Sequence, residues 1–461
     1  MMEQSLAQRV LQAALETGGD FAEIFLEDTE ANSVYMIDNK VENANHTRSH
    51  GAGIRVLRGT GCVYVYTVDT TEKGLLQCAK AAAAALQGER IALPQMFVPR
   101  QFAVAPAISP ADINNPHRID LMRRGYDAAR GFSGDISQVS ARVTDEDQRV
   151  LICNSEGLFA QDQRTRVRFA ISAVASKDGQ VQTGSQSPGM GMGYEAFDII
   201  DAAAAGRRAA EQAVTMLTAP ECPAGQFPVV IGGGFGGVIF HEACGHSLEA
   251  TAVSKGNSEF CGKLGQKIAS DCVTAIDDGT LCGEWGSLHI DDEGTPTQKN
   301  VLIQNGILQG YMIDLLGARR MHMPTTGSGR RESYCYAPTS RMTNTYIAAG
   351  EHDDEEMLRT MGEGLYARSM GGGSVNPLTG EFNFAVDEGY WVRDGRIVTP
   401  VRGATLIGKG SQVLLDIDRV GKNMTMGAGM CGSVSGSVPT NVGQPQIRVS
   451  KLTVGGKGEA L

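Results

Sequence analysis

The side chains best suited to chemistry lie together in the segment His241–His246, which reads HEACGH. Two imidazoles with a carboxylate beside the first are the components of a zinc hydrolase site. In such a site the imidazoles bind the metal, and the carboxylate accepts a proton from the attacking water. This segment is therefore the candidate catalytic site, with Glu242 as the candidate base.

The spacing of the two histidines predicts an irregular helix between them. In the common zinc motif, H-E-x-x-H, the histidines lie at i and i+4, about 40° apart around a helix. His241 and His246 lie at i and i+5, which places them about 140° apart on the same reckoning. A π-type turn closes at i+5 and is found at functional sites. We therefore predict a π-type turn or a break at Gly245.

A catalytic zinc site also needs a third protein ligand, which the local spacing does not identify. The candidates are Cys244, Glu249, His289, the acidic run Asp291–Glu293 and the distant Cys431. Cys244 lies between the two histidines, so its side chain is expected to point elsewhere. Spacing alone does not choose among the others, and it leaves open that the histidines are ordinary residues of a helix surface or core edge.

A glycine pattern precedes the histidines. Gly232, Gly234 and Gly237 form G-x-G-x-x-G after an apolar segment, which is typical of a dinucleotide-binding turn, and Glu259 would be its acidic ribose partner. The sequence that follows lacks the pattern of a buried parallel strand. We therefore interpret these glycines as a tight strand-to-helix turn against the candidate metal helix.

The composition excludes several classes of protein. The 461 residues include 41 Lys+Arg and 52 Asp+Glu, a formal net charge of −11, so the chain is unsuited to bind nucleic acid. No apolar stretch approaches the ~20 residues of a membrane span. The first residues do not resemble a secretion signal, and the ten cysteines include no C-x-x-C pair. We therefore expect reduced thiols and a cytoplasmic location.

Hydrophobic periodicity predicts an α+β fold, in which a small N-terminal domain with antiparallel strands precedes a large, mainly antiparallel β domain with the short metal-binding helix. The predicted helices are 4–17, 72–87, 117–131, 196–217 and 351–361. The predicted strands include 21–28, 32–44 and 53–67, with β-hairpins over 137–176. The predicted regions are an N-terminal domain (1–89), a proline-rich connector (90–116), a middle region of hairpins and helix (117–220) and a C-terminal domain (226–461).

The segment HEACGH resembles the HExxxH motif of the TldD/PmbA metalloprotease family, in its TldD-type subgroup. Other segments resemble motifs of that family in the same order along the chain. They are DDEGTP (291–296), GRRES (329–333), RMTNTY (341–346), GGGSVNPLTGEFNFAVDEGY (371–390) and GMCGSVSGSVPTNVGQP (429–445). The resemblance covers nearly all of the C-terminal half and extends more loosely to the first 90 residues.

The resemblance implies a zinc-dependent peptidase that hydrolyses unfolded or extended peptides, with residues 226–461 as its metalloprotease domain. It implies that His241, His246 and Cys431 bind one zinc ion per chain and that Glu242 is the general base. It also implies a dimer around an internal cavity, either a homodimer or a heterodimer with a PmbA-type subunit that lacks the metal motif.

The alternative function is a non-catalytic peptide-binding or scaffold subunit with a structural metal. Glu242 argues against it, because structural zinc sites do not require a carboxylate beside a ligand. Arg330, Arg331 and Tyr346 are candidates to assist the oxyanion or the substrate, and salt bridges or β packing would explain them equally well.

Overall fold

The computed structural model of the chain describes residues 2–376 and 379–459. The fold is α+β with mostly antiparallel sheets, which confirms the predicted fold class. The segment 371–390 contains Pro377 and Leu378, which lie outside the described residues.

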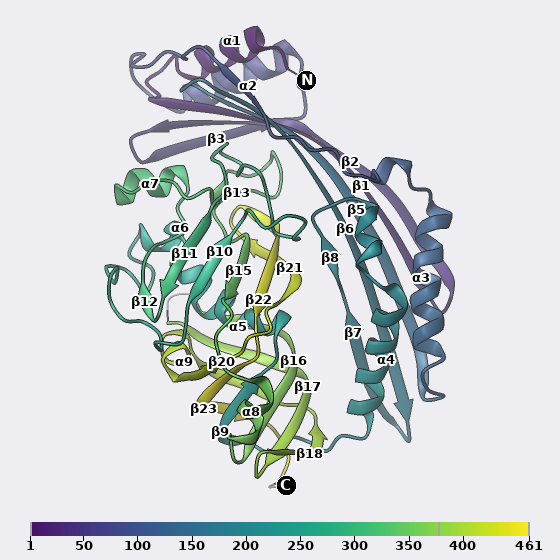
Figure 1. Cartoon of the computed structure of the whole chain (residues 1–461). Coiled ribbons are helices and arrows are strands. Elements are labelled where there is room, and N and C mark those ends of the chain that lie inside the picture. Colours follow the sequence, from purple (N-terminus) through teal and green to yellow (C-terminus); the bar gives the residue numbers. More distant parts are fainter. Residues whose placement is uncertain (1, 377–378, 460–461) are drawn as a thin grey trace.

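A long eight-stranded sheet arches along one side of the molecule (Figure 1). Its strands are β1 (Phe21–Ile37), β2 (Lys40–Arg58), β3 (Gly61–Thr67), β4 (Val98–Gln101), β5 (Ile136–Asn154), β6 (Leu158–Lys177), β7 (Gln180–Gln186) and β8 (Gly189–Met190). The order is β3-β2-β1-β5-β6-β4, and β7 and β8 also pair with β6. Because β1 pairs with β5 over nearly its whole length, this central sheet runs through both the N-terminal and the middle regions.

Two pairs of helices pack on the central sheet, one pair toward each end (Figure 1). They are α1 (Gln4–Ala14) with α2 (Glu72–Ala84), and α3 (Asn115–Arg130) with α4 (Ala202–Leu217). The predicted apolar stripe of α1 is buried, including Val10 and Leu11. The hydroxyl of Thr71 accepts a hydrogen bond from the Gly74 N–H and caps α2, so this helix begins at the predicted residue.

Some predicted element boundaries in this half are wrong. Segments 21–28 and 32–44 were predicted as separate strands, but β1 runs unbroken to Ile37 and the chain turns at Asp38 and Asn39, whose φ angles are 44° and 62°. The start of β2 is exposed, so it has no hydrophobic alternation to mark it as a strand. The helix predicted from 196 begins at Ala202, because Asp201 caps it.

The C-terminal domain contains two larger sheets and a two-stranded ribbon. The first sheet contains β10 (Ala275–Asp278), β11 (Lys299–Gln304), β12 (Ile307–Leu308), β15 (Asn344–Ile347), β21 (Thr425–Ser433) and β22 (Gly436–Gln444). The second contains β9 (Gly225–Ile231), β16 (Gly364–Val375), β17 (Glu381–Arg393), β18 (Arg396–Val401), β19 (Thr405–Lys409), β20 (Ile417–Val420) and β23 (Ile447–Gly455). The ribbon pairs β13 (Gly329–Arg330) with β14 (Thr339–Ser340).

The helices of this domain are short: α5 (Val238–Phe240), α6 (Ala250–Val253), α7 (Leu315–Met321), α8 (Asp354–Arg359) and α9 (Gly410–Asp416). The helix predicted over 351–361 is thus shorter than expected, because Asp353 caps it through the N–H groups of Glu355 and Glu356. The apolar core of the domain encloses α5, with Phe240 fully buried. Burial on all sides fixes the position of the segment that continues into the two histidines.

Buried ion pairs join the central sheet to the C-terminal domain. Arg55 on β2 pairs with Glu23 and with Glu293, each at 2.7 Å, and Arg331 pairs with Glu23 at 2.6 Å. Removing one partner of such a buried pair leaves an uncompensated charge, which is strongly destabilising. Each of these charges therefore depends on its partner across the boundary between the sheet and the domain.

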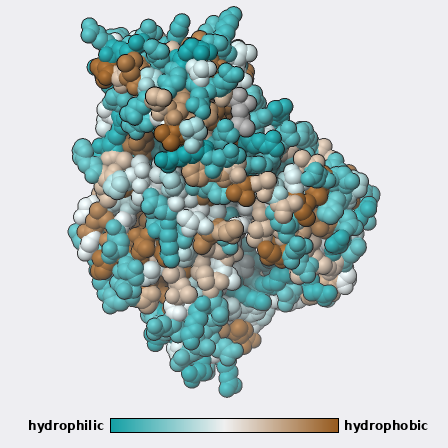
Figure 2. Space-filling view, turned by 45° about the horizontal axis from the view of Figure 1, so that its top comes forward, coloured by the Kyte–Doolittle hydropathy of each residue, from teal (hydrophilic) through white to brown (hydrophobic). Residues whose placement is uncertain are grey.

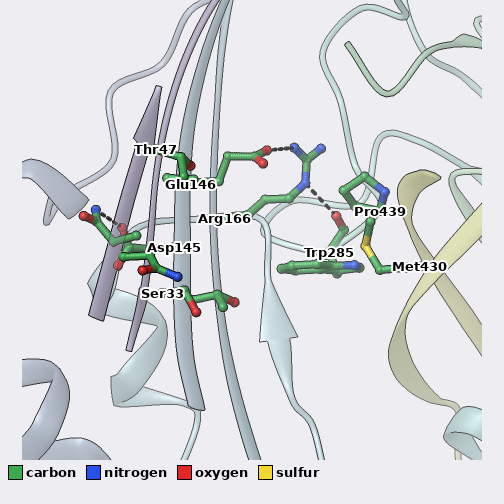
Figure 3. A pocket seen from close by; sticks show the side chains of 12 residues that line it. Ser33, Thr47, Asp145, Glu146, Arg166, Trp285, Met430 and Pro439 are labelled. Atoms are coloured by element: carbon green, nitrogen blue, oxygen red, sulfur yellow. Dashed lines mark hydrogen bonds and ion pairs between the residues drawn. The ribbon is translucent and has the colours of Figure 1, made fainter. Parts of the chain in front are cut away.

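The central sheet and the C-terminal domain also meet at two arginines of β6, Arg164 and Arg166. The Nε–H of Arg166 donates to the Trp285 carbonyl at 3.1 Å (Figure 3). Arg164 pairs with Asp292 across the same boundary. The sheet thus forms a wall beside the C-terminal domain.

Hydrophilic residues cover most of the face shown in Figure 2, with apolar residues in small groups between them. Among the described residues, no helix has the length and apolarity needed to cross a membrane.

Candidate metal centre

The two motif histidines lie on one wide helical turn. The chain passes from α5 into a π-helical turn, His241–Gly245, and then into a 3₁₀ turn, His246–Leu248. The His246 N–H donates to the His241 carbonyl, which is the i→i+5 bond of a π turn. The π-type turn predicted from the histidine spacing is therefore confirmed.

Close packing at Gly245 accompanies this wide turn. A Cβ atom at Gly245 would lie 2.3 Å from the sulfur of Met342, closer than real atoms approach. The absence of a side chain lets Met342 pack directly against the turn. The extra residue in the turn brings the two imidazoles together, with ring centroids 5.0 Å apart and planes at 81°.

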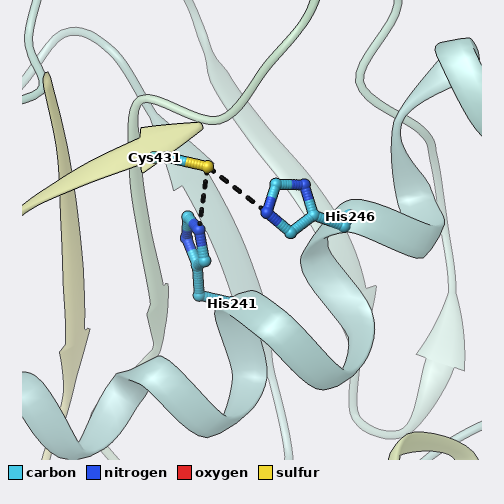
Figure 4. Close-up of side chains that lie close together, drawn as sticks. All are labelled: His241, His246 and Cys431. Atoms are coloured by element: carbon cyan, nitrogen blue, oxygen red, sulfur yellow. Dashed lines mark hydrogen bonds between the residues drawn. The ribbon is translucent and has the colours of Figure 1, made fainter. Parts of the chain in front are cut away.

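Cys431 completes a set of three donor atoms. It lies on β21, and its Sγ is 3.3 Å from Nε2 of His241 and 3.3 Å from Nε2 of His246 (Figure 4). The three donor atoms all lie within 4.8 Å of one another. Donors of a tetrahedral zinc site lie about 3.3–3.8 Å apart, given bonds of about 2.0–2.3 Å. The set is therefore chemically suited to hold a metal ion, and both sulfur–nitrogen distances fall in this range.

The surroundings of Cys431 favour its thiolate form. Burial alone would raise the pKa of the thiol, but the hydrogen bonds from His241 and His246 outweigh burial and lower that pKa to about 4. Burial would likewise lower the pKa of His246, but the charge of Glu249 and the bond to Cys431 raise it well above its usual value. A thiolate is the form of cysteine that binds metals.

Glu249 orients one of the histidines. Its Oε2 lies 3.2 Å from Nδ1 of His246, so the other ring nitrogen faces the sulfur. Arg341 is fully buried, and its Nε lies 4.0 Å from Oε1 of Glu249. It also donates to the Cys431 carbonyl and, at 2.9 Å, to the Gly436 carbonyl. One guanidinium therefore supports both the orienting carboxylate and the strand that carries the cysteine.

Glu242 lies at the open side of the donor set. Its carboxylate is 3.9 Å from Nε2 of His246, and its side chain is 27% exposed. It is thus close enough to act on a molecule at the centre and remains in contact with solvent.

Three family models cover most of the chain. The PmbA/TldA metallopeptidase domain 1 matches residues 22–86, the central domain matches 108–217, and the C-terminal domain matches 224–456. The chain belongs to the TldD/PmbA metallopeptidase family.

Individual relatives agree with this assignment to the TldD/PmbA family. The Metalloprotease TldD homolog of Haemophilus influenzae is 37% identical over 448 residues, which cover 95% of this chain and 93% of that protein. The Zinc metalloprotease TldD homolog of Saccharolobus solfataricus is 26% identical, with 97% of this chain and 99% of that protein covered. The crystal structure of TldE from Thermococcus kodakarensis has the same fold, with a TM-score of 0.78 at 18% identity, covering 97% of this chain and 99% of that chain.

The other candidate ligands of this TldD/PmbA chain lie away from the donor set or point elsewhere. Cys244 is buried, its sulfur faces the Gly410 carbonyl at 3.8 Å, and burial raises the pKa of its thiol well above the usual value. His289 binds Asp162, with 2.9 Å between Nδ1 and Oδ1. Within the described residues, only His241, His246 and Cys431 form a cluster of this kind.

The acidic run Asp291–Glu293 is occupied in the junction with the central sheet. Asp292 binds Arg164, and Glu293 binds Arg55. Asp291 accepts backbone hydrogen bonds from Glu293, Thr295 and Gly329. These carboxylates hold the domain together and do not face the histidines.

The glycine pattern is a tight turn, as interpreted. A Cβ atom at Gly237 would lie 2.5 Å from the backbone nitrogen of Gly443, so the turn packs directly on β22. Glu259, the ribose-binding candidate of the dinucleotide alternative, lies 3.8 Å from Lys409.

Sequence reasoning missed Arg341 and the orienting role of Glu249. Glu249 follows His246 by three residues, a spacing at which helical side chains meet, and this was the available signal. Arg341 has no such local signal, because it reaches Cys431 only through the fold.

Replacing Glu249 with Gln is expected to weaken zinc binding by about 10–100-fold, the usual effect of losing a group that orients a metal-binding histidine. The change keeps the shape of the side chain and removes its charge. Competition with a chromophoric chelator measures the affinity. The matched control is Glu259→Gln, which removes a partly buried carboxylate beside Lys409. Equal zinc affinity in both variants would contradict an orienting role for Glu249.

Proposed function

We propose that this chain is a zinc-dependent peptidase in which His241, His246 and Cys431 hold one zinc ion and Glu242 is the general base. The observation that carries the proposal is the convergence of two Nε2 atoms and one Sγ atom beside a partly exposed carboxylate. The motif histidines and the cysteine come from segments far apart in the sequence. A purely structural packing of these residues would not require Glu242 at the open side.

His241, His246 and Cys431 would hold the zinc ion, which would supply acidification of water and polarisation of the carbonyl under attack. Glu242 takes a proton from the attacking water and delivers it to the nitrogen of the leaving amine. Glu249 keeps the Nε2 of His246 turned inward, and Arg341 fixes the backbone of Cys431. A thiolate donates more charge than a third histidine, so we expect modest turnover.

Burial of the centre supports extended peptides as substrates. Cys431 and His241 are 5% and 4% exposed, and the side chains of His246 and Glu242 are 15% and 27% exposed. The surface of a folded protein does not reach donors that are buried to this degree, whereas an unfolded or extended chain can approach them. Unstructured peptides are therefore the proposed substrate class.

The proposed assembly is a dimer, either of two copies of this chain or with a PmbA-type subunit. Its support is membership of the TldD/PmbA family. The proposed location is the cytoplasm, and its support is that all ten cysteines are free. Size-exclusion chromatography with light scattering tests the assembly, with and without a PmbA-type subunit.

The proposed function predicts about one zinc ion per chain in the purified protein. The native chain, with its partner subunit where one is required, should cleave an unstructured peptide and leave a tightly folded protein intact. A chelator should stop cleavage, and added zinc should restore it. Elemental analysis and mass spectrometry of the peptide products provide the measurements. Chelator-resistant cleavage, or bound zinc without cleavage in either assembly, would contradict the proposal.

A further inference from the structure

A polar cavity of about 230 Å³ lies between the central sheet and the hairpin of β21 and β22. Four arginines line it: Arg164, Arg166, Arg330 and Arg331. It shares Glu146, Arg166, Met430 and Pro439 with a neighbouring cavity of about 280 Å³, part of which is drawn in Figure 3. The two cavities therefore lie side by side along the sheet.

Both cavities adjoin the candidate metal centre. Met430 lines both cavities, is 51% exposed and directly precedes Cys431 on β21. Successive side chains of a strand point to opposite faces, so the cavities and the metal donors lie on the two faces of one strand. Arg330 is linked to the centre as well, because it donates to the carbonyl of Met342, the residue packed on the π turn.

Two of the four arginines are held in close ion pairs. Arg164 pairs with Asp162 and Asp292, and Arg331 pairs with Glu23. These pairs belong to the junction that joins the two parts of the molecule. They leave little charge for a ligand.

Arg330 is different. It is 2% exposed, and its Nη1 donates a hydrogen bond to the Met342 carbonyl. Among the described residues, no carboxylate oxygen lies within 4.0 Å of its guanidinium nitrogens. Burial and the neighbouring Arg166 lower the pKa of Arg330 to about 9. A buried guanidinium without a counter-charge is costly unless an anion joins it.

Arg166 adds a second guanidinium to the same wall. It is 4% exposed, with the Trp285 carbonyl at 3.1 Å and Glu146 at 3.6 Å. The remaining lining carboxylates are engaged elsewhere, because Asp292 binds Arg164 and Glu332 accepts the Ser437 N–H. The cavity thus contains Arg330 without an ion-pair partner, beside Arg166, whose 3.6 Å contact with Glu146 is the longest ion pair among the cavity arginines, and it has room for a small anionic group.

We propose that this cavity is a subsite for a carboxylate of the peptide substrate, bound by Arg330 and Arg166. The proposal rests on the proposed peptidase function, which makes the ligand a peptide. An extended peptide that runs along β21 presents successive side chains to alternate faces. A residue next to the one at the metal centre then faces the arginines, which suit a carboxylate in charge and hydrogen-bond geometry.

The carboxylate has two sources, an acidic side chain or the peptide C-terminus. Four matched peptides distinguish them, with Glu or Gln beside the cleavage position and with a free or amidated C-terminus. We expect one of these carboxylates to lower KM by about 10–100-fold relative to its neutral counterpart, the range of hydrogen bonds to charged groups. Arg330→Gln should bring that ratio close to one, and Arg330→Lys should retain part of it.

The matched control is Arg402→Gln, which removes a guanidinium paired with Glu221 outside the cavity and should keep the native ratio. Zinc content and thermal unfolding establish that the Arg330 variants are folded. Cleavage of all four peptides at equal KM by the native protein would overturn the subsite and leave the peptidase standing. If no peptide is cut, the peptidase fails, and the Kd of fluorescent versions of the same peptides still tests the subsite. Equal Kd values would overturn it.

Discussion

Replacing Glu242 with Gln is expected to lower peptide hydrolysis by about 10²–10⁴-fold, the usual effect of losing a general base. The variant should bind zinc as the native protein does. The reason is geometric, because the carboxylate stands beside the donor set, 3.9 Å from Nε2 of His246, and the three donor atoms are supplied by other residues. Gln has the same size and hydrogen-bonds in the same place but cannot accept the proton.

Three measurements on one preparation separate catalysis from metal binding in this variant. They are zinc content, peptide affinity and the rate of product formation. The matched control is Glu356→Gln, the same change at an exposed carboxylate of α8 that pairs with Arg359, and it should retain full activity. Unchanged cleavage by Glu242→Gln would remove Glu242 from the mechanism. Loss of zinc together with activity would make it a ligand or a structural residue.

The wide turn at the histidines was predictable because it depends only on local spacing. His241 and His246 are five residues apart, and one ion can contact both rings only if the helix widens between them. The prediction therefore required no knowledge of the rest of the fold. The same local reasoning predicted that Cys244 points away from the two histidines, and its sulfur does face the Gly410 carbonyl.

The third member of the donor set was not predictable from spacing. Cys431 is 190 residues from His241, and only the pairing of β21 with β22 beside the π turn brings them together. Resemblance to the TldD/PmbA family supplied Cys431 where local chemistry left several candidates. The acidic run Asp291–Glu293 remained a candidate for the third ligand, because its sequence does not show that Glu293 pairs with Arg55 and Asp292 with Arg164.

The fold shows the same division between local and distant information. Helices with an apolar stripe, such as α1 and α2, were predicted close to their actual bounds. The strands of the central sheet were predicted less closely. One reason is that β1 pairs with β5 across more than one hundred residues, and another is that Lys40–Arg48 has no hydrophobic alternation. Pairing with β1, not the residues themselves, makes that polar stretch a strand.

Replacing Cys431 with Ala is expected to remove most of the bound zinc and nearly all hydrolysis. A catalytic zinc site has three protein ligands, and the sulfur is the donor that lies 3.3 Å from both imidazoles. With the thiolate gone, two histidines remain, and we expect the zinc affinity to fall by more than about 100-fold, beyond the usual loss from an orienting group.

Cys244→Ala is the matched control for this variant. It removes a thiol that is also fully buried and lies inside the same motif, yet faces the Gly410 carbonyl, so the variant should keep its zinc. Cobalt substitution identifies the ligand directly, because a cobalt–thiolate bond gives a charge-transfer absorption band. That band should be present in the native protein and in Cys244→Ala and absent in Cys431→Ala. If Cys431→Ala kept zinc, activity and the band, the third ligand would have to be another residue, and a role of Cys431 at the metal centre would be excluded.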